Sequence, residues 1–226
     1  IQHGIACASY HAGLENEDRQ FIQQQFLNGS LDWVVATNAF GMGVHKEDIR
    51  QVIHESMPAT VANYMQEIGR AGRDGADAVA IMLTSPQDKE LATFIAEEDL
   101  PRDAHIEAYL NNPTQKYDPA IFFDQYRMSE TIYRVLQYWL SIEPVEQVKL
   151  RLDQIRLTKR KEVEKMASII EGNDCIRRKV IEYFGQVLTT PLDACCSNCG
   201  LVESAFLKER QIDGNRINDE NWESRL

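Results

Sequence analysis

Two arginines set three residues apart lie in a glycine-rich stretch, QEIGRAGRDG, at residues 66–75. Arginine carries a permanent charge and a planar fork of donors that suits phosphate oxygens. Residues three apart are neighbours on one face of a helix, so Arg70 and Arg73 can point the same way where the stretch leaves a helix end. Such a pair can stabilise charge on a transferring phosphoryl group. The alternative is a surface turn with two solvated arginines, and this stretch alone does not decide between them.

Four of the five cysteines gather late in the chain, at Cys175, Cys195, Cys196 and Cys199. Adjacent cysteines seldom pair in a disulfide framework, and no secretory signal is present, so a metal is favoured over bridges. Cys196 and Cys199 form a knuckle, and Cys175 opens a predicted helix whose dipole favours a thiolate. With Cys195 as fourth ligand the predicted site is a closed, structural zinc site. The alternatives are inert cysteines, or three ligands and one cysteine that does not bind.

Basic residues gather just before and within the cysteine region, in contrast to the rest of an acidic chain. Such a patch favours contact with a phosphate backbone without reading of sequence. The residues that we expect to contact nucleic acid are Arg156, Lys159, Arg160, Lys161, Arg177 and Arg178. The alternative is the solvated face of a helix, because Glu162 and Glu164 interleave with the basic side chains. Trp139 and Tyr133 are expected in the core rather than as platforms for bases.

A loop of small residues, ATNAFGMGV at 36–44, can approach a phosphate or a nucleic-acid backbone closely, with Gly41 and Gly43 as its candidate contacts. No G-x-x-x-x-G-K-S/T sequence occurs in the chain. That sequence would cradle a nucleotide triphosphate. We therefore expect ATP and Mg²⁺ to be held mainly by another domain.

The composition is that of a globular chain, with 43% hydrophobic and 26% charged residues and a formal net charge of −11. That charge excludes nucleic-acid binding through the overall charge and requires a local patch. No run of about 18 apolar residues is present, so no membrane span is predicted. The chain has no initiator Met, and we interpret it as part of something longer.

Short apolar runs that alternate with helical patterns predict an α/β fold in the first part of the chain. The predicted elements, in order, are a strand at 5–9, a helix at 15–28, strands at 32–36 and 50–54, a helix at 60–69 and a strand at 78–83. Thr60 is the predicted N-cap of the second helix. This order indicates a RecA-like parallel sheet with helices on both faces, where ligands meet the carboxyl ends of the strands.

The remainder is predicted to be mainly helical. Helices are expected at 86–98, at 130–141 with Ser129 as N-cap, at 158–171 and at 174–184, whereas 99–128 reads as irregular and 145–157 is ambiguous between strand and helix. We divide the chain into a lobe at 1–98, a helical insertion or connector at 99–157, a zinc-binding subdomain at 158–202 and a polar tail or linker at 203–226.

Together these motifs resemble the RecQ family of DNA helicases. The matching stretches are YHAGL at 10–14, VATNAFGMG at 35–43, QEIGRAGRDG at 66–75, and C-x-R-R from residue 175 with YFG at 183–185 and the CCSNC knuckle. Their combination is more specific than any one motif. The resemblance implies a second RecA-like motor lobe followed by a zinc-binding subdomain. A first lobe, with the P-loop and the magnesium-binding acidic motif, would precede the chain.

The resemblance also implies roles for single residues. Arg73 resembles the arginine finger that reaches the γ-phosphate, with Gln66 and Arg70 as its companions in sensing nucleotide. The loop at 37–45 resembles the element that links nucleotide state to DNA contact, and the four clustered cysteines resemble the zinc ligands. The segment at 100–157 is longer than the connection expected between lobe and zinc module.

The implied function is that of an ATP-dependent 3′-to-5′ helicase acting on single-stranded or forked DNA, with Zn²⁺ held here and ATP and Mg²⁺ mainly by the upstream lobe. This chain alone is expected to hydrolyse essentially no ATP. The alternatives are an RNA helicase lobe of the same superfamily, or a non-catalytic module for DNA binding or partner docking. The expected location is the bacterial cytoplasm, associated with the nucleoid, or the nucleus of a eukaryote.

Overall fold

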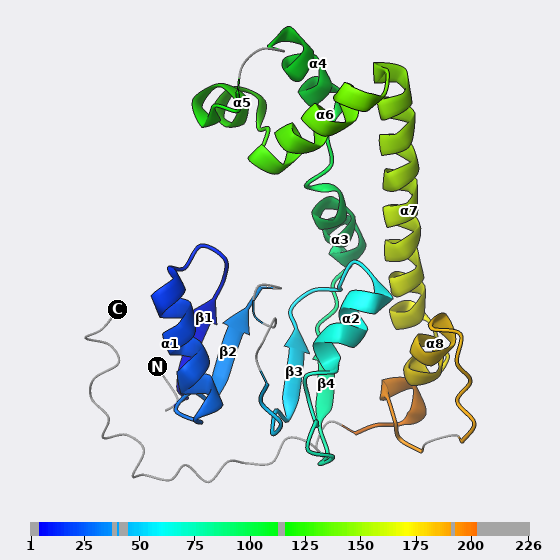
Figure 1. Ribbon diagram of the computed structural model, residues 1–226. Coiled ribbons are helices and arrows are strands. Elements are labelled where there is room, and N and C mark those ends of the chain that lie inside the picture. Colours follow the sequence, from blue (N-terminus) through cyan, green and yellow to red (C-terminus); the bar gives the residue numbers. More distant parts are fainter. Residues whose placement is uncertain (1–4, 38–39, 41–44, 113–115, 191–192, 203–226) are drawn as a thin grey trace. The chain divides into compact units, whose positions relative to one another are not determined.

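The computed structural model describes residues 5–37, 40, 45–112, 116–190 and 193–202 (Figure 1). The predicted contacts Gly41 and Gly43 and the predicted tail at 203–226 lie outside the described residues. The chain divides into two compact units. The first comprises the described residues of 1–50, 70–79 and 202, and the second comprises those of 51–69 and 80–201.

The first unit is built on a β–α–β arrangement. β1 (Cys7–Tyr10) and β2 (Trp33–Ala36) pair in parallel, residue for residue. Because parallel strands cannot be joined by a tight turn, α1 (Asn16–Leu27) makes the crossover between them. Ile22 and Phe26 are the buried residues of α1 and stand four apart, as one face of a helix requires. The first two predicted strands and the helix between them are confirmed.

A second pair of parallel strands follows the same logic. β3 (Gln51–His54) and β4 (Val79–Met82) form a two-stranded sheet, and α2 (Val61–Ile68) lies between them in the sequence. The first amide of β4 donates to the carbonyl of Arg50, and the amide of Leu83 donates to the last carbonyl of β3, each at 2.9 Å. The same sequence offset separates donor and acceptor in both bonds, so the strands run parallel.

Both predicted N-caps are confirmed. The Thr60 hydroxyl accepts a hydrogen bond from the Asn63 amide at 3.0 Å at the start of α2. The Ser129 hydroxyl accepts one from the Ile132 amide at 3.2 Å at the start of α6 (Glu130–Ile142). Each bond satisfies a backbone donor that has no partner within its helix.

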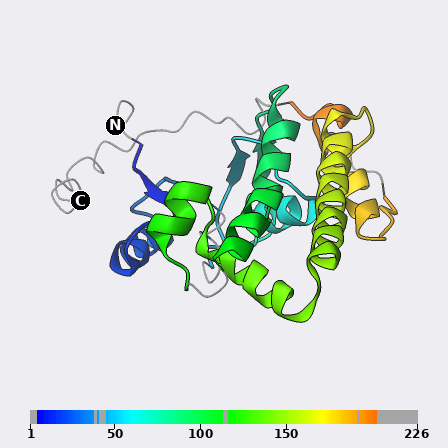
Figure 2. The same cartoon turned by 90° about the horizontal axis from the view of Figure 1, so that it is seen from above.

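Three further helices pack together in the second unit. α3 (Asp88–Glu97) lies alongside the second half of α7 (Val145–Glu171), as both views show (Figures 1 and 2), and α8 (Ile176–Tyr183) packs near the end of α7. The buried core that they share with α2 contains Val61, Ala92, Val163, Met166 and Val180. α3 and α7 are also joined by ion pairs, Lys89 to Glu164 at 2.7 Å and Glu97 to Arg160 at 2.5 Å.

A separate helical cluster occupies the predicted insertion. α4 (Asp103–Asn111) and α5 (Pro119–Tyr126) form in the segment that was predicted to be irregular, and they pack with α6. That prediction was wrong because Pro119 begins α5, at the first helical position where proline is tolerated, and Asp118 caps it. Phe122, fully buried, anchors α5 in the cluster core.

The ambiguous segment at 145–157 is the first half of α7. Its apolar residues alternate as in a strand, but Leu150 is 53% exposed whereas Val148 and Leu152 are buried. The two buried residues stand four apart and belong to the core of the α4–α6 cluster. The spacing of the buried residues therefore fits a helix and not a strand.

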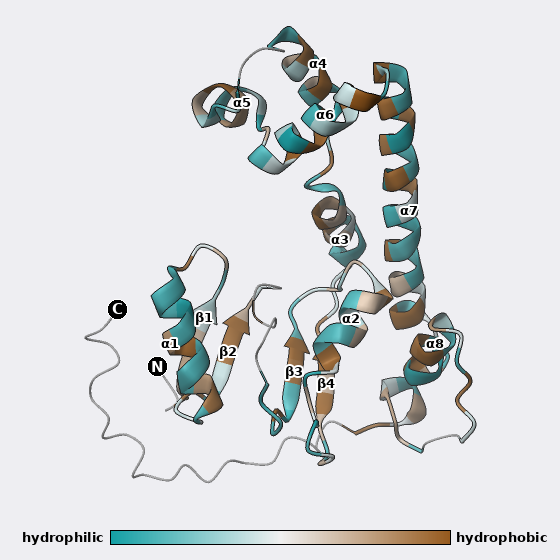
Figure 3. Cartoon of the chain, in the orientation of Figure 1, coloured by the Kyte–Doolittle hydropathy of each residue, from teal (hydrophilic) through white to brown (hydrophobic). Residues whose placement is uncertain are grey.

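α7 runs without a break through the boundary at 157/158, where the sequence analysis divides connector from zinc-binding subdomain. Its hydrophobic and hydrophilic segments alternate along its length (Figure 3). One helix thus serves two buried cores, one reached by Val148 and Leu152 and the other by residues from Val163 onward. No helix within the described ranges is long and apolar enough to cross a membrane.

Truncation of the shared helix tests this packing. Leu152→Ala removes a side chain that is 1% exposed. It should lower the free energy of unfolding by about 2–5 kcal/mol, because a cavity is left in a packed core. The matched change Leu150→Ala, two residues away and exposed, should stay within about 0.5 kcal/mol of the unaltered protein. Urea unfolding of both variants measures the difference, and equal losses would contradict the assigned face of α7.

Candidate functional site

The four clustered cysteines converge in space. Their sulfur atoms, one each from Cys175, Cys195, Cys196 and Cys199, all lie within 4.8 Å of one another. The sulfurs of Cys175 and Cys195 are 3.5 Å apart. A tetrahedral zinc with bonds of about 2.3 Å to sulfur sets its ligand sulfurs about 3.8 Å apart. The donor set and its spacing therefore fit a zinc ion, and all four predicted ligands are brought together.

Two local structures hold the sulfurs in place. Cys175 is the N-cap of α8, and its sulfur accepts from the Arg178 amide at 3.5 Å. The knuckle is a short 3₁₀ turn (Ser197–Cys199) in which the Cys199 amide donates to the Cys196 carbonyl at 2.9 Å. The turn closes with Gly200 at a φ of 82°, a left-handed conformation that favours glycine.

Asn198 joins the knuckle to the loop before α8, a role that the sequence analysis missed. Its side-chain amide donates to the carbonyls of Gly172 and Asp174, each at 2.8 Å. Cys175 directly follows Asp174, so these bonds hold the first ligand next to the other three. The amide of a lone asparagine inside a C-x-x-C sequence has no predictable partner, and only the fold reveals it.

The thiols compete for protons. Burial opposes ionisation of Cys196, but hydrogen bonds from the Ile176 backbone and from Cys199 outweigh it and lower the pKa of Cys196 to about 7. Hydrogen bonds with the thiols of Cys175 and Cys196 raise the pKa of Cys199 to about 12. Four close sulfurs cannot all ionise by themselves, whereas a bound dication would favour the thiolate at each.

The two arginines lie in the turn that follows α2, Arg70 partly buried and Arg73 exposed. The backbone between them is fixed at Gly72, whose amide donates to the Ile49 carbonyl at 2.9 Å. Gly72 has a φ of 67°, and the Gly75 amide donates back to its carbonyl at 3.0 Å. The turn is therefore built on glycine, as its sequence suggested.

A bidentate ion pair, which the sequence analysis missed, fixes the far side of this turn. Both terminal nitrogens of Arg50 donate to the Asp74 carboxylate, one of them at 2.9 Å. The Ala76 amide donates to the same carboxylate at 3.0 Å. Chiefly through Arg50, these bonds lower the pKa of Asp74 to about 2, so the carboxylate is charged at neutral pH. Arg73 is thus flanked on both sides by residues whose positions are fixed.

The predicted nucleotide contact Gln66 is exposed in the last turn of α2. The next residue, Glu67, contacts the buried His54 of β3, with 2.7 Å between carboxylate oxygen and Nε2. The His54 ring also lies 5.3 Å from that of Tyr64. These contacts fasten α2 to β3 and fix the helix from which Gln66 projects.

The basic residues do not form one free patch. Arg156 donates to the Pro101 carbonyl and pairs with Asp153, and Arg160 pairs with Glu97, so both tie α7 to its neighbours.

The other four predicted nucleic-acid contacts differ in whether their side chains form ion pairs. Arg178 pairs with Asp174 at 3.3 Å. Arg177 is exposed. Lys159 and Lys161 have no ion-pair partner in the described part of the chain.

Two family models match the chain. Residues 1–75 match the helicase conserved C-terminal domain, and residues 143–200 match the RecQ zinc-binding family. The second match contains all four clustered cysteines and the whole of α7 and α8. Together the two matches support a RecQ-family helicase C-terminal region. The four clustered cysteines lie within the zinc-binding match, and their spacing supports a structural zinc ion.

Similar proteins agree with this RecQ-family assignment. "Probable ATP-dependent DNA helicase RecS" of Bacillus subtilis is 38% identical over 208 residues, which cover 87% of this chain and 42% of the relative. The B. subtilis ATP-dependent DNA helicase RecQ is 44% identical over 94 residues, 42% of this chain and 16% of the relative. A relative from Acanthamoeba polyphaga mimivirus, 40% identical over 116 residues (51% of this chain, 21% of the relative), is named provisionally as an ATP-dependent RNA helicase. The chain spans less than half the length of each of these relatives.

Loss of one zinc ligand should be distinguishable from a harmless change beside it. Cys199→Ser and Cys195→Ser should each abolish stoichiometric zinc and lower the unfolding temperature, because zinc binding contributes folding free energy. Ser197→Ala, inside the same knuckle, should keep one zinc per chain. Elemental analysis of the purified protein measures the metal. Full zinc in Cys195→Ser would remove that residue from the ligand set.

The arginine turn makes a second prediction. A Cβ at Gly72 would lie 3.0 Å from the Ala76 carbonyl oxygen and 3.2 Å from the Ala78 side chain, whereas one at Gly75 would meet nothing within 4 Å. Both glycines have positive φ, which costs alanine about 1–2 kcal/mol. Gly72→Ala should therefore lower the free energy of unfolding more than Gly75→Ala, measured by urea unfolding. Equal losses would show that the close backbone contacts at Gly72 are unimportant.

Proposed function

We propose that the intact protein is an ATP-dependent DNA helicase of 3′-to-5′ polarity, to which this chain supplies the second motor lobe and the zinc module. The observation that carries the proposal is the presence on one chain of the helicase C-terminal match and a converged four-cysteine site. Two relatives are named as ATP-dependent DNA helicases. The upstream lobe would hold ATP and Mg²⁺.

Arg73 is the arginine finger in this proposal. Its neighbours Gly72 and Asp74 are fixed by bonds to Ile49 and Arg50, so its backbone cannot drift. The exposed side chain can then reach a nucleotide held by another lobe with little ordering left to do, which is what charge stabilisation in phosphoryl transfer requires.

Further nucleotide contacts come from the same stretch and from the small-residue loop. Arg70 and Gln66 would sense the nucleotide beside Arg73, and Gly41 and Gly43 would let their loop approach it or the DNA closely. Zinc, when bound, supplies a rigid cross-link between the knuckle and α8 and takes no part in the reaction.

Single-stranded or forked DNA is the proposed substrate. Lys159, Lys161 and Arg177 are the residues best placed for the phosphate backbone, whereas Arg156, Arg160 and Arg178 would have to leave ion pairs. An RNA substrate is the second candidate because one relative is named as an RNA helicase. We favour DNA because the zinc site belongs to the RecQ family. The protein would act at the bacterial nucleoid or in the nucleus of a eukaryote.

Arg73→Ala in the intact protein tests the motor. DNA-stimulated ATP hydrolysis should fall by about 1,000-fold, the lower range for loss of an arginine finger, while binding of single-stranded DNA is retained. Arg134→Ala removes an exposed arginine of α6 paired with Glu130 and should leave hydrolysis unchanged. Unchanged hydrolysis in Arg73→Ala would favour the non-catalytic alternative. Stimulation by RNA but not DNA would favour the RNA helicase.

A further inference from the structure

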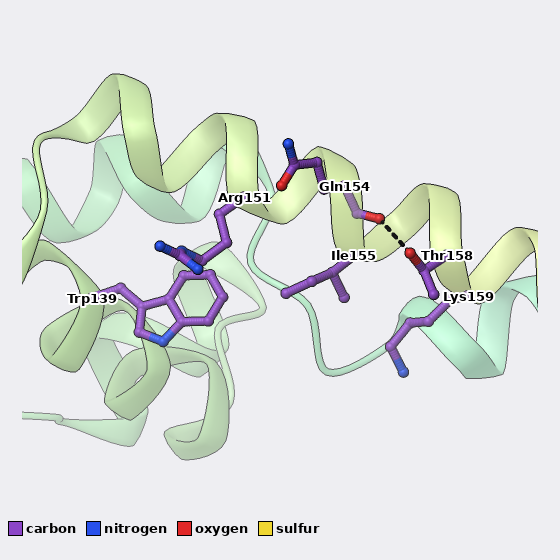
Figure 4. A pocket seen from close by; sticks show the side chains of 6 residues that line it. All are labelled: Trp139, Arg151, Gln154, Ile155, Thr158 and Lys159. Atoms are coloured by element: carbon purple, nitrogen blue, oxygen red, sulfur yellow. Dashed lines mark hydrogen bonds between the residues drawn. The ribbon is translucent and has the colours of Figure 1, made fainter.

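A pocket of about 350 Å³ lies between α6 and α7 in the second unit, and none of its lining residues belongs to the cysteine cluster. Its lining, drawn in Figure 4, consists of Trp139 from α6 and Arg151, Gln154, Ile155, Thr158 and Lys159 from α7. This volume is at the small end of the range for ligand pockets. It suits a single planar group with a short polar extension, and it is far too small for a duplex.

One end of the pocket is a planar platform. The Arg151 guanidinium lies over the Trp139 ring, 5.4 Å from its centroid (Figure 4). Glu143 holds that guanidinium through two hydrogen bonds, one of them 3.1 Å from Nε. The Arg151 side chain is still 50% exposed, so a large part of it remains accessible to a ligand. A guanidinium fixed in this way is a stacking surface for a nucleobase.

Lys159 places a positive charge at the other end of the pocket. Lys159 lines the pocket, is partly buried, and has no ion-pair partner among the residues that the structure describes. It follows Arg151 by eight residues, about 12 Å along the helix axis. A partly buried ammonium without a carboxylate favours an anionic ligand, because burial has removed part of its hydration.

The middle of the pocket is mixed in character. Ile155 supplies an apolar surface between the platform and the lysine. The Thr158 hydroxyl donates to the Gln154 carbonyl at 2.9 Å (Figure 4), so its lone pairs remain as acceptors. The Gln154 side chain can donate and accept toward a base edge. An apolar floor with adaptable polar groups accepts bases with little regard to their identity.

We propose that this pocket binds one nucleotide of single-stranded DNA, with the base stacked on Arg151 over Trp139 and the phosphate at Lys159. The proposal rests on the proposed helicase function and adds a strand contact at residues other than the clustered cysteines and the arginine turn. It also revises the expectation for Trp139, which packs on the α4–α6 core with one part and supports the platform with another.

The α5–α6 pair is a weaker candidate for contact with nucleic acid. α5 and α6 are joined by a three-residue turn with Arg127 in the left-handed conformation (φ 55°), an arrangement similar to a helix–turn–helix. Residues 99–143, however, contain seven acidic and four basic side chains. Such a balance opposes approach to the phosphates of a duplex. The basic side chains begin to predominate on α7, at the pocket.

Binding of a short oligothymidine to the intact protein, followed by fluorescence anisotropy, tests the lysine. Lys159→Ala should weaken binding several-fold and reduce the slope of log K against log salt by about 0.7, the value for one phosphate on a single strand. Lys165→Ala removes the same charge from α7 six residues further on, away from the pocket, and should change both quantities much less. Equal effects of the two variants, or no effect of Lys159→Ala, would overturn the proposal.

Arg151→Lys separates stacking from charge. Lysine keeps the charge but lacks the planar fork, so oligothymidine binding should weaken by about tenfold, as for loss of one stacked base. Affinity equal to that of the unaltered protein would overturn the platform. In a protein whose other tryptophans are replaced by phenylalanine, oligothymidine should quench the Trp139 fluorescence and an abasic strand of equal length should not. Equal quenching by both strands would contradict base binding.

DNA-stimulated ATP hydrolysis, measured on the same samples, separates this proposal from the one it rests on. If DNA still stimulates ATP hydrolysis and both Lys159→Ala and Arg151→Lys bind oligothymidine normally, the pocket proposal is overturned and the helicase proposal stands. If both variants bind oligothymidine more weakly but DNA does not stimulate ATP hydrolysis by the unaltered protein, the helicase proposal is overturned and the pocket proposal stands. Tighter binding of oligouridine than of oligothymidine would overturn the choice of DNA.

Discussion

The second unit depends on one helix that must satisfy two hydrophobic cores. α7 contributes Val148 and Leu152 to the α4–α6 cluster and Val163 and Met166 to the core with α2, α3 and α8. None of its residues from 153 to 162 is buried. Over that span Arg156 and Arg160 replace apolar packing with polar ties to the Pro101 carbonyl and to Glu97. The same span, unburied and basic, forms one wall of the pocket beside Trp139.

Because α7 contributes to both cores, it also connects the inserted α4–α6 cluster to the zinc module. A long helix transmits position along its axis because its backbone bonds are internal. The α4–α6 cluster and the zinc module are therefore fixed to opposite halves of one rigid element. The zinc site adds a second fastening at its end, where Asn198 holds the knuckle to the residues that precede α8. In the first unit, the ion pair between Arg50 and Asp74 fixes the backbone beside Arg73 in the arginine turn.

Much of the candidate site follows from residue types alone. Four cysteines with a knuckle spacing specify a tetrahedral thiolate site whatever the fold around them, because the metal imposes its own geometry. The glycines around Arg70 and Arg73 specify a tight turn for a similarly local reason. Asn198, Arg50 and Asp74 could not be assigned from the sequence because their partners lie 24 to 26 residues away. No local pattern specifies such a pairing.

The sequence by itself determined the strand–helix alternation, the caps at Thr60 and Ser129, the clustering of four cysteines suited to zinc and the resemblance to the RecQ family. Each of these depends on short-range periodicity, on a side chain that bonds its own backbone, or on ligand chemistry. Only the tertiary structure decided that 145–157 is helical, because alternation at Val148, Leu150 and Leu152 fits a strand until burial shows which of them face a core. Only the fold showed that Arg160 is committed to Glu97, sixty-three residues away, whereas Lys159 beside it is not. Periodicity is a property of neighbours along the chain, and the partners of a charge are a property of neighbours in space.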